Sequence, residues 1–424
     1  MKIQRPIGTY DLTPEETAVW SRIETTIRAL FDQYNYGEIR TPIFEYTELF
    51  KRGVGESSDI VSKEMYTFED RGGRSLTLRP EGTAGVVRAY LENGLAKKNP
   101  GVTKLWYFAP MFRYERKQKG RFRQHVQYGC EVLGSPGPDI DIELLVMLNQ
   151  LYTTLGLVEL DLKINSVGCP ACRPIHRDRF VHYVQPMLGE FCEDCQRRFE
   201  VNPLRMFDCK SQDCQARLEN APKLNDHLCE TCVAHFGSLK AGLDAFQIAY
   251  QVDTKLVRGL DYYTRTAFEM NYAPLGSQGV LVGGGRYDGL VEYLGGEPTP
   301  GIGFGAGMER LILILNETHK TISANTAIDL FVITMGDTAN QAGTQLLRTL
   351  RQAGLRCDRD FTGKSFKKQI QMADKLGSRF VAILGDTEVE QRVLQIKNLA
   401  TGEQQTLPWT DSLADVTTLL RSCT

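Results

Sequence analysis

Hydrophobic and polar residues alternate between Leu105 and Gly134 in the pattern of a β-hairpin. The first arm is rich in aromatic and apolar residues. On the second arm the apolar side chains recur at every second position: Val126, Tyr128, Cys130 and Val132. This period of two is typical of a strand with one buried face, and it puts Gln127 and Glu131 on the other face. Residues 115–120 contain no apolar side chain, so the tip is predicted to be a solvated loop.

Positive charge is concentrated at this tip. Residues 113–123 contain one acid, Glu115, and six cations: Arg113, Arg116, Lys117, Lys119, Arg121 and Arg123. We therefore expect an anionic ligand to bind there, next to a carboxylate and an amide that face a pocket. The alternative is an ordinary solvated loop beside an edge strand whose charges deter aggregation.

A helix with one apolar face is predicted near the N-terminus. Thr13 is a candidate N-cap, Pro14 occupies the first helical position and Glu16 completes a capping box. Apolar residues then recur at spacings of three and four, and Gly37 ends the helix. The strand predicted at 38–40 is followed by Pro42, which favours an edge or an interface because proline cannot donate to a ladder.

The next predicted elements extend a sheet. A strand at 75–78 leads into a helix at 82–91, and Arg79, Glu81 and Thr83 lie at their junction. Loops between rigid elements commonly carry ligand groups, although a surface turn explains the same residues. After the hairpin, a helix from 139 to 156 and a strand from 158 to 164 continue the predicted sheet.

Glycine-rich strands follow in the second half of the chain. Residues 255–270 mix apolar and aromatic residues with Arg258 and Asp261, and three consecutive glycines precede Arg286. Alternating glycines at 301, 303, 305 and 307 then lead into an apolar helix with Arg310 near its start. Glycine permits close approach of a ligand, and a helix N-terminus with an arginine favours phosphate. The structural alternatives are an amphipathic strand pair, a tight turn and a helix packed on a glycine strand.

A separate α/β domain is predicted beyond a polar linker at 316–326. The pattern there predicts strands at 330–334, 355–359 and 380–384, an edge strand at 393–398, and helices at 338–353 and 365–376. Lys364, Lys367 and Lys368 at the start of the second helix suit RNA phosphates, although such a cluster is more commonly a solvated helix face.

Length and composition fit a globular protein of several domains. A chain of 424 residues is expected to form two or three domains, and 42% hydrophobic and 24% charged residues are typical of a protein with a core. No apolar run approaches the ~20 residues of a membrane span, and the N-terminus has no apolar signal core. We therefore expect a cytoplasmic location. A net charge of −2 argues against a strongly basic nucleic-acid binder.

Eight of the eleven cysteines fall between residues 169 and 232. They form four close pairs: Cys169 and Cys172, Cys192 and Cys195, Cys209 and Cys214, and Cys229 and Cys232. Such pairs in a cytosolic chain suit tetrahedral Zn²⁺ bound by thiolates. The favoured grouping is nested, with the two inner pairs on one ion and the two outer pairs on another. The alternatives are a cross-braced grouping, eight free thiols, or a histidine at one corner, with four candidates: His176, His182, His227 and His235.

Five segments, in order, resemble the bacterial histidyl-tRNA synthetases. The helix and strand ending at Pro42 resemble class II motif 1, FRYERKQKGRFRQ with its second strand resembles motif 2, and GIGFGAGMERL resembles motif 3. LVRGLDYYTRTAFE and GGGRYDGLVEYLGG are similar to the two signatures that set the histidine enzymes apart within class II. The resemblance covers nearly the whole chain outside the cysteine segment.

This resemblance implies the fold class and the domains. We expect an α+β catalytic domain built on an antiparallel sheet of six or more strands, of the class II synthetase type, with a Cys-rich inserted domain and a C-terminal α/β anticodon-binding domain. The catalytic domain would contain residues 1–166 and 241–320, the insertion with its candidate zinc sites residues 167–240, and the anticodon-binding domain residues 327–424. A homodimer with motif 1 as its dimer element is also implied.

The resemblance further implies the reaction of a histidine–tRNA ligase. ATP, with Mg²⁺, and L-histidine give histidyl-adenylate and pyrophosphate, and the histidyl group then passes to the 3′ end of tRNA(His). Because the substrate carboxylate attacks the α-phosphorus, catalysis rests on positioning and on neutralisation of phosphate charge. The catalytic residues implied are Arg113 and Arg258, the latter in the place where other class II enzymes rely on a metal ion.

Matching motif positions imply the remaining roles. The residues implied for ATP binding are Arg113, Glu115, Arg121 and Arg310. Those implied for histidine binding are Glu81, Thr83, Gln127, Glu131, Arg258, Tyr262 and Tyr263. Arg116 and Gln118 would approach the tRNA acceptor stem. His125 stands where many relatives carry an aromatic residue that stacks on adenine, and an imidazole can still stack there.

Two alternatives belong to other classes of protein. A non-catalytic histidine-binding paralogue that regulates ATP phosphoribosyltransferase shares the catalytic fold. Such paralogues lack the anticodon-binding domain and usually lose the motif arginines, whereas Arg113, Arg258 and Arg310 are all present. A zinc-dependent nucleic-acid-binding protein would explain the cysteines but leaves the glycine and arginine signatures without a reason.

Overall fold

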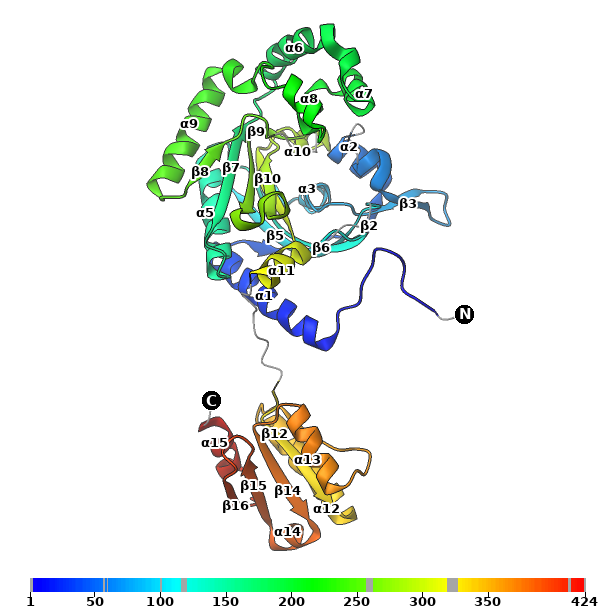
Figure 1. Ribbon diagram of the computed structural model, residues 1–424, viewed down its shortest axis with the longest axis vertical. Coiled ribbons are helices and arrows are strands. Elements are labelled where there is room, and N and C mark those ends of the chain that lie inside the picture. Colours follow the sequence, from blue (N-terminus) through cyan, green and yellow to red (C-terminus); the bar gives the residue numbers. More distant parts are fainter. Residues whose placement is uncertain are drawn as a thin grey trace. The chain divides into compact units, whose positions relative to one another are not determined.

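The computed structural model describes residues 3–55, 58, 60–99, 101–115, 120–256, 262–318, 327–410 and 413–422. The chain forms two compact units (Figure 1): residues 1–12 and 20–322 make the larger one, and residues 13–19 and 323–424 make the smaller one. Among the described helices, none combines the length and apolar character needed to cross a membrane. Three predicted site residues, Arg116, Gln118 and Arg258, lie outside the described residues.

The larger unit is built on one main sheet. Its strands, among the described residues, follow the order β1-β5-β6-β11-β10-β9-β7-β8. Their bounds are β1 Gly37–Glu38, β5 Thr103–Phe112, β6 Gln124–Leu133, β7 Leu160–Ser166, β8 Tyr250–Val252, β9 Thr264–Tyr272, β10 Val280–Arg286 and β11 Gly301–Gly307. All inner pairs are antiparallel, and the outermost strands β1 and β8 each pair in parallel with their neighbour. The predicted antiparallel sheet is therefore confirmed.

Two long helices cover one face of this sheet, α1 (Pro14–Gln33) and α5 (Asp139–Thr154). The Phe31 ring of α1 packs edge-on against Trp106, with ring centroids 5.5 Å apart. The Tyr152 hydroxyl of α5 lies 3.0 Å from that of Tyr128. The predicted capping box is present in part, since the Thr13 amide donates to the Glu16 carboxylate at 2.8 Å. Because side chains alternate along a strand, Tyr107, Gln127 and Glu131 project from the opposite face.

Further elements complete the larger unit. A small antiparallel sheet has the strand order β2-β4-β3. The bounds are β2 Phe44–Tyr46, α2 Thr47–Val54, the π-helical turn Ile60–Glu64, β3 Tyr66–Glu69, β4 Ser75–Leu78, α3 Thr83–Glu92, α4 Leu95–Lys98, the 3₁₀ turn Ala273–Gln278, α10 Leu290–Tyr293 and α11 Met308–Glu317. Because α11 continues to Glu317, the prediction that the linker begins at Asn316 is wrong. Asn316 and Glu317 are polar because they lie at the end of a helix.

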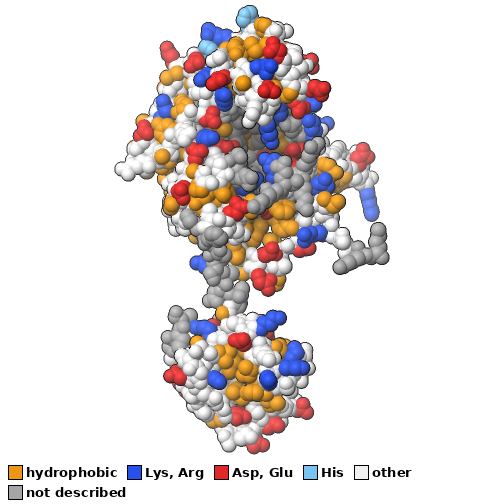
Figure 2. All heavy atoms as spheres, viewed as in Figure 1, with side chains coloured by type: hydrophobic (Ala, Val, Ile, Leu, Met, Phe, Trp, Pro, Cys, Tyr) orange, Lys and Arg blue, Asp and Glu red, His pale blue; other side chains and the backbone are white. Residues whose placement is uncertain are grey.

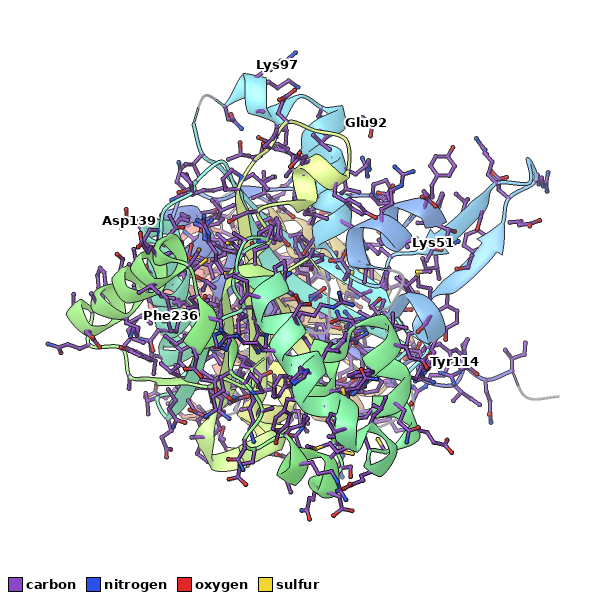
Figure 3. All side chains as sticks on the ribbon, turned by 90° about the horizontal axis from the view of Figure 1, so that it is seen from above. Lys51, Glu92, Lys97, Tyr114, Asp139 and Phe236 are labelled. Atoms are coloured by element: carbon purple, nitrogen blue, oxygen red, sulfur yellow. The ribbon has the colours of Figure 1, made fainter. Side chains whose placement is uncertain are left out.

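The cysteine-rich insertion is helical and has its own small core. Its elements are α6 Arg173–Val184, α7 Glu193–Val201, α8 Gln212–Arg217 and α9 Glu230–Ala245, with 3₁₀ turns at Gln185–Glu190, Pro203–Asp208 and Leu224–His227. Helices α6, α7 and α8 gather at the top of the larger unit in Figure 1. Helix α9 runs past the predicted boundary at residue 240 and packs on α5: a Cβ on Gly242 would come 2.2 Å from Ile142. Phe236 of α9 and Asp139 of α5 lie on the same side of the unit (Figure 3).

The smaller unit is an α/β domain with a mixed sheet, as predicted. Its strand order, in the part of the chain that is described, is β13-β12-β14-β15-β16. The bounds are β12 Leu330–Met335, α12 Asp337–Gln352, β13 Cys357–Arg359, α13 Phe366–Lys375, β14 Phe380–Gly385, α14 Asp386–Gln391, β15 Val393–Asn398, β16 Gln404–Pro408 and α15 Ala414–Ser422. The prediction that 393–398 is an edge strand is wrong, because β16 pairs outside it. Strand β16 was not predicted, because its residues are mostly polar and exposed.

Candidate active site

A buried carboxyl group lies on the open face of the main sheet. Glu131, in β6, is 0% exposed. Its two oxygens accept hydrogen bonds from the Thr83 hydroxyl at 2.7 Å and from the Tyr287 hydroxyl at 2.6 Å. Burial is the main cause that raises the pKa of Glu131 from 4.5 to about 8. The carboxyl is thus held in one orientation at a site that favours a positively charged or hydrogen-donating ligand.

The alternating glycines of β11 form the floor beneath this carboxyl. Gly303 pairs with Glu131 across the sheet, and a Cβ on Gly303 would lie 1.8 Å from Glu131 Oε2. A Cβ on Gly305 would lie 1.9 Å from Gln127 Nε2. Glycine therefore makes room for two polar side chains that lie flat on the strand. The buried Gln127 Oε1 has no hydrogen-bond partner among the described residues, so it is an acceptor available to a ligand.

A second buried carboxylate lies at the N-terminus of α3. Glu81 accepts hydrogen bonds from the backbone amides of Thr83 at 2.7 Å and Ala84 at 2.9 Å. Burial raises its pKa, whereas these two amides and the nearby Arg113 lower it. The Tyr262 and Tyr263 rings pack 4.8 Å apart beside it. The structure thus brings together the described residues of the predicted histidine-binding set: Glu81, Thr83, Gln127, Glu131, Tyr262 and Tyr263.

Sequence reasoning missed two tyrosines in this pocket. Tyr287 donates to Glu131, as described above, and Tyr107 projects into the space left by Gly82 and Gly129. A Cβ on Gly82 would lie 2.3 Å from the Tyr107 ring. Burial and then the nearby Glu131 raise the pKa of the Tyr107 phenol. Tyr287 lies within one of the two histidine-enzyme signatures, and Tyr107 lies in the aromatic arm of the hairpin. The sequence did not show that either side chain points into the pocket, because this depends on the glycines that lie opposite in the folded chain.

A polar cluster lies at the mouth of the hairpin. Arg113 Nε donates to the Pro80 carbonyl at 2.7 Å, and its Nη1 lies 3.8 Å from Glu115. Arg121 donates to the other oxygen of Glu115 at 3.1 Å. Arg310 lies close to Arg121. Burial, and then the positive charge of Arg121, lower the pKa of Arg310. All four predicted ATP-binding residues are therefore together, and Figure 2 shows Lys and Arg side chains around a recess of the larger unit.

His125 lies on β6 between these two groups. It pairs across the hairpin with Met111. Burial, and then the positive charge of Arg113, lower the pKa of His125 from 6.5 to about 3. The imidazole is therefore neutral at physiological pH, and a neutral aromatic ring is suited to stacking. Adenine stacking at His125 stays a prediction.

Comparison with known proteins gives these residues a context. The family described as histidyl-tRNA synthetase matches residues 8–170 and 206–311, and the family described as anticodon binding domain matches residues 329–419. The chain is 48% identical to a histidine–tRNA ligase of Acetivibrio thermocellus, over 96% of this chain and 97% of the relative, and 49% identical to one of Desulforamulus reducens, over 96% of each. The crystal structure of apo S. aureus histidyl-tRNA synthetase is 40% identical, covers 99% of both chains and matches with a TM-score of 0.84.

The chain belongs to the histidyl-tRNA synthetase family. Membership in this family confirms the resemblance found in the motifs, the class II fold with its C-terminal anticodon-binding domain, and the enzyme class. The model of the histidyl-tRNA synthetase family leaves residues 171–205 unmatched. This segment lies within the cysteine-rich insertion.

Two groups of four thiols occur in the described part of the insertion, and within each group the sulfur atoms lie within 4.8 Å of one another. The neck cluster consists of Cys169, Cys172, Cys229 and Cys232, and the distal cluster of Cys192, Cys195, Cys209 and Cys214. This is the nested arrangement favoured by the spacing. Among the described residues no histidine belongs to either cluster. His176 lies 2.8 Å from the Pro222 carbonyl and His235 lies 2.9 Å from Asp141.

The sulfur separations suit a tetrahedral thiolate site. Cys169 and Cys229 lie 3.7 Å apart, Cys172 and Cys232 lie 3.8 Å apart, and Cys192 and Cys209 lie 3.7 Å apart. Four sulfur atoms bound tetrahedrally at ~2.3 Å from Zn²⁺ are separated by about 3.8 Å, whereas a disulfide is about 2.05 Å long. The eight thiols are free of disulfides. The donor set and its spacing therefore fit Zn²⁺.

Proposed function

We propose that this chain is a histidine–tRNA ligase that activates L-histidine with ATP and transfers the histidyl group to tRNA(His). One observation carries the proposal: the buried carboxyl of Glu131 and the charged cluster around Arg113 lie on one hairpin. An amino acid held at Glu131 would present its carboxylate towards Arg113. Family membership indicates the class of reaction, and the polar groups of this pocket indicate histidine as the amino acid substrate.

Catalysis requires no nucleophilic side chain. The histidine carboxylate oxygen attacks the α-phosphorus of ATP, a new O–P bond forms, and the P–O bond to the leaving pyrophosphate breaks. Arg113 and Arg258 would neutralise the charge that develops on the phosphoryl oxygens. Mg²⁺ bound with ATP would neutralise the pyrophosphate. Glu115 would contact the adenine amino group, while Arg121 and Arg310 would hold the outer phosphates.

Recognition of histidine would use groups that are already oriented. Glu131 and Tyr263 would contact the two imidazole nitrogens, and Tyr262 would line the pocket. Glu81, Thr83 and Gln127 would bind the ammonium group, for which Gln127 Oε1 is an open acceptor. A site that hydrogen-bonds a polar side chain rejects apolar amino acids strongly, because buried polar groups would be left unpaired.

The same proposal includes tRNA, a second subunit and zinc. The smaller unit would bind the anticodon, and Arg116 and Gln118 would approach the acceptor stem. A homodimer is supported by apolar side chains exposed around the small sheet: Ile43, Phe44, Tyr46 and Phe68. Light scattering would report the dimer. The neck and distal clusters would each hold one structural Zn²⁺, so metal analysis is expected to find two ions per chain.

The decisive experiment is histidine-dependent ATP–pyrophosphate exchange. Exchange is expected with histidine alone among the amino acids. Arg113→Ala and Arg258→Ala are expected to reduce it by about 100-fold or more, since each removes charge stabilisation from the transition state. Arg123→Ala is the matched control, because Arg123 lies on the same hairpin but packs its guanidinium over Tyr114 at 3.8 Å.

The alternative, a regulatory paralogue that binds histidine without activating it, makes the opposite prediction. A protein that binds histidine in calorimetry but shows no exchange would favour that paralogue. The match of residues 329–419 to an anticodon-binding domain supports the ligase.

A further inference from the structure

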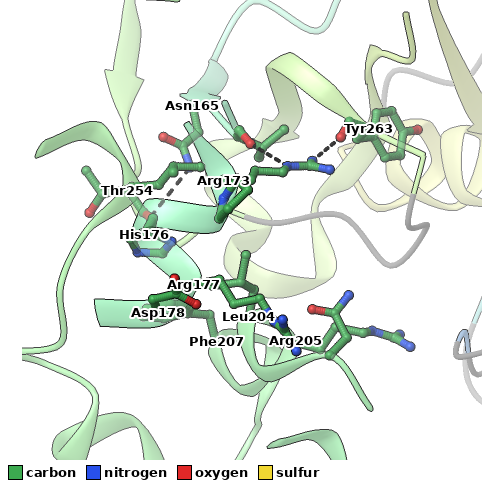
Figure 4. Close-up of a pocket in the computed structure, with 14 residues that line it drawn as sticks. Asn165, Arg173, His176, Arg177, Asp178, Leu204, Arg205, Phe207, Thr254 and Tyr263 are labelled. Atoms are coloured by element: carbon green, nitrogen blue, oxygen red, sulfur yellow. Dashed lines mark hydrogen bonds between the residues drawn. The ribbon is translucent and has the colours of Figure 1, made fainter. Parts of the chain in front are cut away.

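Arg173 connects the neck cluster to the histidine pocket. It is the first residue of α6 and directly follows Cys172. Its Nε donates to the Val167 carbonyl at 2.9 Å, and its Nη2 donates to the Tyr263 carbonyl (Figure 4). One guanidinium therefore bridges the end of β7 and the peptide of Tyr263 just before β9. Within the described residues, Tyr263 is the second after the segment that contains Arg258.

A cavity adjoins Tyr263, so part of this residue has no side chain packed against it among the described residues. It has a volume of about 300 Å³ and lies between the insertion and the main sheet, with Arg173 and Tyr263 on its wall together with Asn165, His176, Arg205 and Thr254 (Figure 4). Apolar support for Tyr263 comes from Val167, Leu224 and Ala267. Leu224 itself belongs to the insertion. The position of the Tyr263 backbone therefore depends on contacts that the insertion supplies.

The neck cluster fixes the backbone from which Arg173 extends. Cys169 and Cys172 follow β7, and Cys229 and Cys232 begin α9, so the four thiols join the two ends of the insertion. Cys172 and Cys232 are each 1% exposed. The Cys169 amide donates to the Cys172 sulfur at 3.1 Å. A metal ion on these four sulfur atoms would hold the start of α6, and hence Arg173, against the sheet.

We propose that the neck cluster and Arg173 act together to position Tyr263 for histidine binding, with Arg173 as a positioning residue. This inference rests on the proposed function, in which Tyr263 contacts the imidazole. The distal cluster lies in another part of the insertion, where Cys195 and Cys214 are buried in the insertion's own core. Loss of the neck cluster therefore weakens histidine binding, whereas loss of the distal cluster leaves it unchanged.

The first test removes the guanidinium and keeps its aliphatic stem. Arg173→Met is expected to weaken histidine binding, measured by calorimetry without ATP, by about 10-fold, the effect of losing one or two hydrogen bonds. The KM for ATP and kcat for exchange are expected to change less than twofold. Arg177→Met is the matched control, because Arg177 lies one turn along α6, lines the same cavity and is exposed. Arg173→Lys, which keeps a donor, should recover part of the affinity.

The second test separates the two clusters. Cys229→Ser and Cys192→Ser should each lower the zinc content by one ion per chain, measured by mass spectrometry, and only Cys229→Ser should weaken histidine binding. Equal histidine affinity in Arg173→Met and wild type, or equal losses for histidine and ATP, would overturn the inference even if Cys229→Ser does not fold. If the wild-type protein binds histidine but shows no ATP–pyrophosphate exchange, the ligase function is refuted. The effect of Arg173→Met on histidine binding can still be measured by calorimetry in that case.

Discussion

The ionised form of Glu131 is costly because its carboxyl is fully buried. Its pKa rises from 4.5 to about 8, so between these values the folded chain holds a proton that the unfolded chain has released. Stability falls with rising pH wherever the folded state binds more protons. The contribution of Glu131 is therefore most favourable below about pH 4.5 and decreases as pH rises to about 8.

Glu131→Gln removes this titration and keeps a similar shape. Relative to the variant, the wild type should lose about 3 kcal/mol of unfolding free energy between pH 5 and pH 8, while the variant binds histidine more weakly at both pH values. Melting temperatures of the two proteins across this range check the prediction. Glu292→Gln, on the exposed surface of α10, should follow the wild type. Parallel melting curves for Glu131→Gln and wild type would show that the carboxyl is ionised in the folded protein.

The sequence predicted the positions of several site residues but not their interactions. Period-two alternation was enough to place Gln127 and Glu131 on one face of β6. It could not show that Thr83 and Tyr287 both donate to Glu131, because those contacts join residues 48 and 156 positions apart. The same limit applies to Arg173, which lies outside every recognised motif and meets Tyr263 through the fold alone.

At the scale of the element, strand β11 is shaped by the side chains that lie across it. Its glycines at 303 and 305 leave no space for a methyl group, since a Cβ would fall 1.8 Å from Glu131 and 1.9 Å from Gln127. Gly307 differs, because a Cβ there would meet Arg310 at 3.8 Å, an ordinary contact. One strand thus offers both a test position and its control.

Gly305→Ala should displace the Gln127 amide and raise the KM for histidine in exchange by about 10-fold or more, as expected when a substrate hydrogen bond is lost. Gly307→Ala should change this KM less than twofold. Steady-state exchange kinetics at saturating ATP give both values. If the two variants behave alike, the space above Gly305 is not part of histidine binding.

Elements with a strong pattern were predicted well, and those stabilised by pairing were not. The hairpin strands, α5 and β14 have buried apolar faces that the sequence displays. Strand β16 is held to β15 by its backbone and has polar, exposed side chains, so it lacks such a pattern. The short helix α14 was missed because it begins immediately after β14, where the apolar run of the strand obscures its start.

At the scale of the whole molecule, two units with separate cores would separate the binding of histidine and ATP from the recognition of the anticodon. The buried core of the smaller unit is formed by its own strands and helices, including Val332, Leu346 and Leu394. Histidine and ATP would bind in the larger unit, whereas recognition of the anticodon would belong to the smaller one. Substitutions on the surface of the smaller unit should therefore affect transfer to tRNA and not histidine activation.

Phe361 offers the sharpest test of this division. It is 67% exposed on a loop that Asp360 fixes by accepting from the Thr362 amide at 3.1 Å, and Arg359 lies over its ring at 5.2 Å. An exposed aromatic ring three residues before Lys364 suits base stacking, worth about 1–3 kcal/mol per base. Phe361→Ala should raise the KM for tRNA by about 10-fold and leave exchange unchanged. Leu376→Ala, at the other end of α13, should alter neither, and an unchanged KM for tRNA in Phe361→Ala would place anticodon contacts elsewhere on the unit.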